Sequence, residues 1–147
     1  MFLVKEFEPE HLPNEQEKNQ IIDFLFEHLE QYGDPREDIE KCLNYALKLS
    51  ESFGGFALLA LDEKIPVGAV IVNKTGMDGY IPGNILVYIA THKEYRGKGL
   101  GKELMKKTLS KTSGPIKLHV EPDNPARFLY EKYGFSSKYL EMRCPNK

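Results

Sequence analysis

Residues 94–105 read EYRGKGLGKELM, a pattern typical of a turn that joins a strand before it to a helix after it. Gly97, Gly99 and Gly101 stand at alternate positions, with Arg96 before them and a helix-forming run after them. Glycines at a strand-to-helix turn leave successive backbone N–H groups uncovered, and the dipole of the following helix favours an anion there. The stretch therefore predicts a turn that binds a phosphate group.

Two common phosphate-binding loops do not fit this spacing. A G-x-x-x-x-G-K-[ST] loop that begins at Gly97 would need a glycine where Lys102 stands. A G-x-G-x-x-G dinucleotide fingerprint would need its third glycine at Lys102 or Leu104. What remains is R-x-x-G-x-G, formed by Arg96, Gly99 and Gly101, and taken alone this motif also fits a plain tight turn.

The hydrophobic periodicity on both sides of the turn predicts alternating strands and helices. Strands are expected at residues 2–7, 56–61, 67–72, 84–91, 116–120 and 139–143. Helices are expected at residues 18–31, from Pro35 to Leu47, from Leu100 to the break before Ser113, and at residues 124–133.

Helix boundaries and buried faces follow from particular residue types. Gly33 can end the first helix, and Asp34 followed by Pro35 is typical of an N-cap and first helical position. The apolar faces of the second and third helices are expected to be Ile39, Leu43, Ala46 and Leu47, and Leu100, Leu104, Met105 and Leu109.

The resulting order, β-α-α-β-β-β-α-β-α-β, predicts a single α/β domain of the α+β mixed-sheet type over residues 1–147. Short turns between the early strands indicate antiparallel pairing. The helical crossover from residues 84–91 to residues 116–120 makes those two strands parallel. Helices are then expected on both faces of a mixed sheet.

A second motif follows the strand expected after the turn. Residues 120–135 read VEPDNPARFLYEKYGF, with Asn124, Ala126, Tyr130, Gly134 and Phe135 at characteristic places. Together with R-x-x-G-x-G and the order of elements, this stretch resembles the GNAT superfamily of acetyl-CoA-dependent N-acetyltransferases. The two motifs cover about the C-terminal half, and the element order extends the resemblance to nearly the whole chain, which implies a GNAT-like fold with a splayed central sheet.

The resemblance implies that acetyl-CoA is the co-substrate and that no metal is needed. Its pyrophosphate would be bound by the backbone of Arg96, Gly97, Lys98, Gly99, Leu100, Gly101 and Lys102. The pantetheine arm would pair with the strand at Ile89, Ala90 and Thr91, where a backbone N–H would also stabilise the oxyanion. Asn124 would cap the following helix and contact the arm, and Arg127 would lie near the nucleotide; both residues also have plainly structural or solvated interpretations.

The catalytic roles implied by the resemblance are incomplete. Tyr130 matches the tyrosine that protonates the departing thiolate, although a tyrosine half-buried in the core is the simpler interpretation of an isolated one. Some family members carry a glutamate as general base eleven residues before the position of Arg96, where this chain has Ile85. The base is therefore unknown. Its weak candidates are His119 and Glu121, followed by Asp78, Tyr80 and the acids of the first two helices.

Charge is unevenly distributed although the net charge is only −2. Residues 15–41 hold nine acidic and three basic side chains, whereas residues 92–147 hold thirteen basic and six acidic ones. This pattern fits either two solvated helix faces or a basic side for an anionic ligand with an acidic side for a cationic one. The resemblance places the acceptor on the acidic side, so a cationic amine is expected: a polyamine, an aminoglycoside, an amino acid or a peptide lysine.

Composition narrows the remaining classes. The chain has 147 residues, is 41% hydrophobic and 29% charged, and has no signal-peptide pattern or membrane-length apolar run, so a cytoplasmic protein is expected. Neither a nucleic-acid nor a membrane partner is indicated. Many relatives are dimers, so a homodimer is an open alternative. Cys42 and Cys144 lie outside both motifs, which favours direct attack of the amine on the thioester over a cysteine intermediate. The alternative function is a non-catalytic acyl-CoA sensor.

Overall fold

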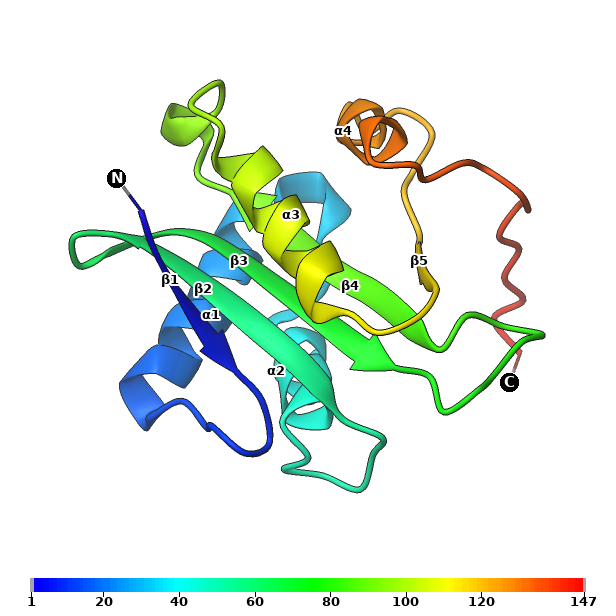
Figure 1. Cartoon of the computed structure of the whole chain (residues 1–147), viewed down its shortest axis with the longest axis horizontal. Coiled ribbons are helices and arrows are strands. Elements are labelled where there is room, and N and C mark those ends of the chain that lie inside the picture. Colours follow the sequence, from blue (N-terminus) through cyan, green and yellow to red (C-terminus); the bar gives the residue numbers. More distant parts are fainter. Residues whose placement is uncertain (1, 147) are drawn as a thin grey trace.

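The structure is a computed structural model that describes residues 2–146 (Figure 1). Its strands are β1 (Leu3–Phe7), β2 (Gly55–Asp62), β3 (Ile65–Lys74), β4 (Asn84–Thr91) and β5 (Ile116–Leu118). Its helices are α1 (Glu15–His28), α2 (Arg36–Ala46), α3 (Leu100–Lys111) and α4 (Arg127–Lys132), with short 3-10 helices η1 (Glu30–Tyr32) and η2 (Lys93–Tyr95).

The five strands form one mixed sheet in the order β1-β2-β3-β4-β5. The first four strands pair antiparallel, as short connections require, and β4 pairs parallel with β5 after the crossover through α3. The parallel pairing covers only three residues of β4, from Asn84 to Leu86. β5 ends at Leu118, opposite Leu86, so within residues 2–146 the rest of β4 has no strand partner on that side, as expected for a splayed sheet.

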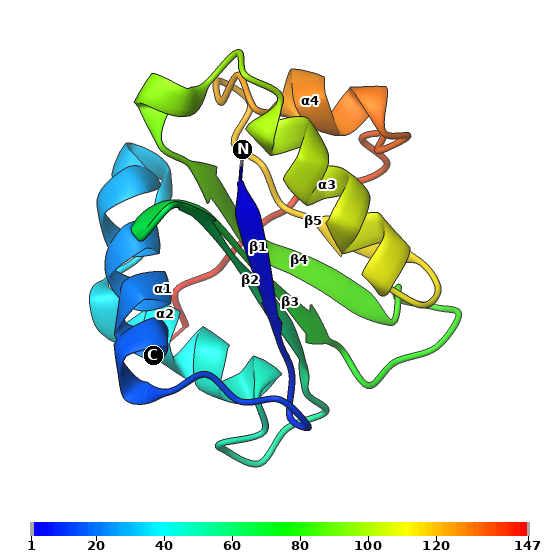
Figure 2. The same ribbon diagram turned by 60° about the vertical axis from the view of Figure 1, so that its left-hand side comes forward.

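Helices cover both faces of the sheet, as Figure 2 shows, with α1 and α2 on one side and α3 and α4 on the other. Consequently β2 and β3 are buried on both faces, so their FALLAL and VGAVIV segments are continuously apolar instead of alternating. Two hydrophobic cores result: one joins α1 and α2 to the sheet, and the other joins α3 and Tyr130 to the opposite face. The predicted fold class is therefore confirmed.

Close packing of α3 on the sheet depends on Gly68 of β3. A Cβ atom at this position would stand 2.7 Å from Cδ1 of Leu104, closer than real Cβ contacts come. Leu100, Leu104 and Met105 are buried as predicted, but Leu109 is only partly buried and Thr108 completes the buried stripe. The absence of a side chain at residue 68 thus lets α3 approach the sheet directly behind the glycine turn.

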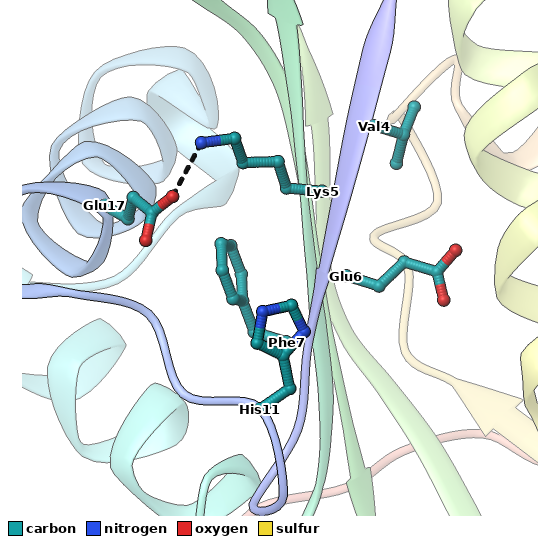
Figure 3. Close-up of a pocket in the computed structure, with 6 residues that line it drawn as sticks. All are labelled: Val4, Lys5, Glu6, Phe7, His11 and Glu17. Carbon is teal, nitrogen blue, oxygen red and sulfur yellow. Dashed lines mark hydrogen bonds and ion pairs between the residues drawn. The ribbon is translucent and has the colours of Figure 1, made fainter.

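The beginning of α1 is fixed by a capping box, three residues before the predicted start. Oδ1 of Asn14 accepts a hydrogen bond from the N–H of Glu17 at 2.8 Å, and Glu17 accepts one from the N–H of Asn14 at 2.9 Å. The other carboxylate oxygen of Glu17 binds Nζ of Lys5 at 2.7 Å across a surface pocket beside β1 (Figure 3). The polar groups of this pocket therefore attach α1 to the edge strand.

Three predictions for the C-terminal third need correction. The fourth helix begins at Arg127, not Asn124, because residues 124–126 form a turn around Pro125. β5 ends at Leu118, before His119 and Val120. No strand forms at residues 139–143, although YLEMR alternates in polarity: within residues 2–146 the short β5 pairs only with β4, and Tyr139, Leu140 and Met142 stay largely exposed.

The second helix also begins differently from the prediction. Its N-cap is Pro35, with no side-chain cap, and Asp34 does not cap it. The Asp34 carboxylate instead accepts a hydrogen bond from Tyr88 of β4. The predicted buried face of Ile39, Leu43, Ala46 and Leu47 is confirmed.

Candidate functional site

The glycine turn, defined as residues 96–102, connects η2 to the first turn of α3. Gly97 and Gly99 have φ angles of 81° and 85°, in the left-handed region that glycine adopts without strain. Gly99 is the N-cap of α3, and no side chain caps the helix there. The turn therefore presents an uncapped helix N-terminus, as the sequence predicted.

The N–H of Arg96 donates to the carbonyl of Lys93 at 3.3 Å, whereas the N–H groups of residues 97–102 have no hydrogen-bond acceptor within residues 2–146. The first N–H of α3 that bonds back along the helix is that of Glu103, just after the turn, which donates to the carbonyl of Gly99 at 3.0 Å. The N–H groups of Leu100, Gly101 and Lys102 precede it and have no acceptor within the helix. Among residues 2–146, no atom lies within 4 Å of where a Cβ of Gly97 or Gly99 would stand. The row of donors is thus accessible to an anionic ligand.

The charged side chains of the glycine turn are solvent-exposed and loosely paired. Arg96 lies 3.6 Å from Glu30 of η1, and each side chain is 57% exposed. Nζ of Lys98 lies 5.1 Å from the centre of the Tyr95 ring, whose hydroxyl donates to Asp62 at 2.7 Å. Exposed pairs of this kind are weak, so both cations can turn toward a phosphate group.

Lysines on the outer face of α3 differ in their availability. Lys107 and Lys111 form ion pairs with Glu6 and Glu8 near β1. Lys102 and Lys106 are exposed, and Lys102 lies within the glycine turn. Of these lysines, Lys102 is the one best situated for a phosphate beside the turn.

The open edge of β4, defined as residues 87–91, leads to the glycine turn. The N–H of His92 donates to the carbonyl of Val67 on β3 at 2.8 Å. Because N–H directions alternate along an antiparallel strand, the N–H groups of Ile89 and Thr91 point away from β3, toward the gap left by β5. A register shift beside Val87 marks the start of this edge. An extended ligand can pair there as an additional strand would.

Tyr130 is buried on the α3 face, 8% exposed, in the same core as Leu86, Leu100 and Leu104. Burial raises the pKa of its phenol to about 12. Its ring meets Phe135 edge-on at 6.1 Å between centres. The phenol therefore keeps its proton at physiological pH, which a proton donor requires.

Asn124 and Arg127 both have structural partners. Oδ1 of Asn124 accepts a hydrogen bond from the N–H of Ala126 at 2.9 Å and so caps the turn before α4, not the helix itself. Arg127 lies 3.6 Å from Glu131 and donates to the carbonyl of Pro122 at 3.4 Å. The structural interpretation accounts for Asn124, and a ligand contact by either residue stays a prediction.

The weak candidates for a general base lie outside the organised part of the site. His119 and Glu121 follow the end of β5 and are exposed, as are Asp78 and Tyr80 in the loop between β3 and β4. None of these four side chains has a hydrogen-bond partner recorded within residues 2–146. Ile85 is paired with both neighbouring strands. The described residues thus give no support for a base at these positions.

A pair that sequence reasoning missed lies on the other face of β4. The Tyr88 hydroxyl donates to Oδ2 of Asp34 at 2.5 Å, joining β4 to the segment between α1 and α2. Tyr88 is 7% exposed, and burial raises its pKa, with the Asp34 hydrogen bond adding to the effect. The available signal was a tyrosine in an otherwise apolar strand, because a buried tyrosine hydroxyl needs a partner.

Two other sets of side chains near this face could take part in chemistry: Cys42, and the pair formed by His28 and His92. The thiol of Cys42 accepts a hydrogen bond from Asn73, and burial raises its pKa to about 12, so it stays protonated and a poor nucleophile. The rings of His28 and His92 lie 4.7 Å apart, where the end of α1 meets the end of β4.

The described residues include no group of three or more His, Cys, Asp or Glu side chains suited to a metal ion. No helix within residues 2–146 has the length and apolar character needed to span a bilayer.

Comparison with known proteins agrees with this geometry. The family model described as acetyltransferase (GNAT) domain matches residues 54–137, which include the open edge of β4, the glycine turn and Tyr130. The chain belongs to the GNAT acetyltransferase family. It is therefore of the class that transfers an acyl group from acyl-CoA to an amine, and the predicted resemblance is confirmed.

Solved GNAT-like structures share the fold over nearly the whole chain. PH1933 from Pyrococcus horikoshii is 22% identical, with 97% of this chain and 93% of that one covered and a TM-score of 0.71. The GNAT family protein SP0256 from Streptococcus pneumoniae is 21% identical, with 100% and 99% covered and a TM-score of 0.69. A chain of a NatC complex bound to Gag peptide and CoA is 21% identical, with 94% and 86% covered and a TM-score of 0.72. No curated protein matched.

Proposed function

We propose that this GNAT-family domain, residues 1–147, is an N-acetyltransferase that moves an acetyl group from acetyl-CoA to a primary amine. The observation that carries the proposal is the continuity of two sets of free donors. The open edge of β4 is followed, after His92, η2 and the glycines, by the uncapped N-terminus of α3. An extended thioester arm ending in a pyrophosphate is the kind of ligand that matches both.

In the proposed complex the pyrophosphate accepts hydrogen bonds from the N–H groups of residues 97–102, and Arg96, Lys98 and Lys102 add positive charge. The pantetheine arm pairs with β4, so that the thioester lies beside Ile89, Ala90 and Thr91. The N–H of Ile89 or Thr91 then stabilises the negative charge that develops on the thioester oxygen. A donor of this kind contributes about a hundredfold in rate.

The chemical step is direct attack of the neutral amine nitrogen on the thioester carbon. The resulting tetrahedral intermediate collapses with cleavage of the C–S bond, and the amine proton leaves through water. Tyr130 donates its proton to the departing CoA thiolate and recovers one from solvent. The high pKa of the buried Cys42 thiol supports this route over a cysteine-linked acetyl intermediate.

The acceptor is proposed to be cationic. Exposed acidic side chains cluster on α1, η1 and the start of α2, on the sheet face opposite α3: Asp23, Glu27, Glu30, Asp34, Glu37 and Asp38. These charges favour a positively charged ligand on that side. The acceptor class therefore includes polyamines, aminoglycosides, amino acids and peptide amines.

The proposal is tested by mixing the protein with acetyl-CoA and a panel of primary amines, while free thiol is followed and the amine is examined by mass spectrometry. We expect thiol release that depends on the amine, an acetylated amine product, and a lower rate in Tyr130→Phe. Tight CoA binding without thiol release for any amine would instead support the acyl-CoA sensor, which the apolar Ile85 at a usual base position favours.

A further inference from the structure

A single carboxylate is fixed beside the open edge of β4 from the side of α1 and α2. Oδ2 of Asp34 accepts the hydrogen bond from the Tyr88 hydroxyl at 2.5 Å, and Tyr88 pairs with Ile71 in the centre of the sheet. Residues on a strand alternate between faces, so the side chains of Tyr88 and Ile89 lie on opposite faces of β4. The carboxylate therefore stands on the face of β4 that α3 does not cover.

The Tyr88–Asp34 pair combines a rigid support with an accessible charge. The Tyr88 ring is buried in the core formed by α1, α2 and the sheet, and its hydroxyl reaches the rim of that core. Asp34 itself is exposed. Within residues 2–146 no ion pair occupies Asp34, and Tyr88 engages Oδ2 alone. The second carboxylate oxygen, Oδ1, can accept a hydrogen bond from a ligand.

Tyr88 holds the Asp34 carboxylate close to the point at which β4 and β5 stop pairing, and this position suits it to contact a ligand. β4 and β5 stop pairing after Leu86, two residues before Tyr88. Figure 2 shows α3 and α4 on one side of the sheet and α1 and α2 on the other, and Tyr88 packs on the side of α1 and α2. A nucleophile that approaches from this side would meet a thioester beside Ile89 to Thr91 through the gap that β5 leaves beside β4. Asp34 is hydrogen-bonded to β4 on this side, whereas the other exposed acids of α1 and α2 have no hydrogen bond or ion pair to β4 within residues 2–146.

We propose that Asp34 binds the ammonium group of the acceptor and that Tyr88 is the residue that positions the Asp34 carboxylate. The inference rests on the proposed acetyl transfer and names the residue that selects its acceptor class. A charge-assisted hydrogen bond from ammonium to Oδ1 holds the acceptor nitrogen beside the open edge until it loses a proton to water and attacks. A neutral amine gains little from the carboxylate.

The charge of Asp34 also affects a basic residue of the chain itself, Arg143. The pKa of Arg143 in the C-terminal tail is raised, first by its hydrogen bond to Glu141 and also by the charge of Asp34. In Figure 2 the tail crosses toward the side of the sheet that carries α1 and α2. Within residues 2–146 Arg143 pairs with Glu141 and not with Asp34, so an acceptor would have no ion pair to displace at Asp34.

The kinetic test compares Asp34→Asn with Glu51→Gln, which removes one exposed charge after α2, outside the acidic group on α1, η1 and the start of α2. The panel pairs amines that are ionised at neutral pH with aromatic amines and hydrazides that are neutral. We expect Asp34→Asn to raise the KM of ionised acceptors at least about tenfold and to change that of neutral ones little. Tyr88→Phe should produce a smaller increase in the same direction, and Glu51→Gln almost none.

A binding measurement decides the inference even if no amine on the panel is acetylated, which would count against the proposed function alone. The protein, saturated with CoA and labelled with 13C at the tyrosine rings, is titrated with butylammonium chloride and with neutral 1-butanol. We expect butylammonium to shift the Tyr88 signals in the wild type but not in Asp34→Asn, and butanol to leave them unchanged. Equal shifts in both proteins, or no shift in either, would overturn the assignment of Asp34.

Discussion

The guanidinium of Arg96 lies 3.6 Å from the carboxylate of Glu30, and this pair joins the glycine turn to the segment that follows α1. The Glu30 carboxylate would compete with a pyrophosphate for the Arg96 guanidinium. We expect Glu30→Gln to lower the Kd for CoA about two- to fivefold, because the competing carboxylate is removed. Isothermal titration at low salt measures the change, and Glu27→Gln is the matched control. Weaker binding in Glu30→Gln would contradict this account of Arg96.

Gly99 tests the shape of the glycine turn. Its φ of 85° costs an alanine about 1–2 kcal/mol, although a Cβ there meets no described atom within 4 Å. Gly99→Ala should therefore lower both the Tm and, by at least about fivefold, the affinity for CoA. Gly79, at φ 88° and equally open, lies in the loop between β3 and β4. Gly79→Ala should lower the Tm similarly and leave CoA binding intact; equal losses of affinity would refute a specific role of the turn.

Tyr130→Phe removes the proposed proton donor and leaves the buried ring in place. We expect kcat to fall by about a hundredfold, with the KM for acetyl-CoA changed little. Because burial raises the pKa of Tyr130 to about 12, loss of its proton should not reduce wild-type activity up to about pH 10. Tyr139→Phe, which alters an exposed tyrosine outside the site, is the control. An unchanged kcat in Tyr130→Phe would remove this residue from the mechanism.

Cys42 separates direct transfer from a covalent route. Its raised pKa leaves almost no thiolate at neutral pH. We therefore expect Cys42→Ala to retain the kcat of the wild type, apart from a modest loss of stability through the partly buried side chain. Intact-protein mass spectrometry after mixing with acetyl-CoA should show no acetyl adduct at Cys42. An adduct that forms and decays at the turnover rate would argue for a cysteine intermediate.

Glu17 gives the fold a defined pH dependence. The Lys5 hydrogen bond, followed by the Asn14 backbone N–H, lowers the pKa of its carboxyl group. A lowered pKa means that the stabilisation is present above the unfolded-state value near 4 and is lost as the pH falls through the folded-state value. Urea unfolding should show Glu17→Gln less stable by about 0.5–1 kcal/mol at pH 7 and closer to the wild type at pH 3.

Glu15→Gln is the control for that experiment, because Glu15 also lies in the first turn of α1 but has no recorded ion pair within residues 2–146. It should show a smaller difference between the two pH values. A wild-type protein whose advantage over Glu17→Gln is undiminished at pH 3 would show that the charge of Glu17 contributes little.

Much of the fold was predictable because local patterns and tertiary packing agree. The alternation and apolar runs of β2, β3 and β4 fixed those strands to within two residues, and the glycine turn identified the start of α3. Residues 139–143 alternate equally well, yet no strand forms, because strand formation needs a neighbouring edge that local sequence does not supply. The start of α4 moved for a similar reason: Asn124 and Pro125 favour a turn as well as a helix start.

The candidate site was predictable where one motif supplies all of its atoms. The glycine turn is continuous in sequence, so its donors and helix N-terminus could be derived from spacing. The Tyr88–Asp34 pair joins residues 54 positions apart, and Asp34 fitted a local role as a helix cap equally well. Contacts made across the sheet depend on the register of β4 and on the path of the loop after η1, neither of which a local pattern determines.

The central claim is that residues 87–102 hold acetyl-CoA so that an amine can attack it, and amine-dependent thiol release tests this claim most directly. The account predicts that wild-type protein releases CoA thiol only when an acceptable amine is present, in equal amount to the acetylated amine. It also predicts a rate about a hundredfold lower in Tyr130→Phe. Thiol release at the same rate with and without amine, or none with any amine despite tight CoA binding, would contradict the account.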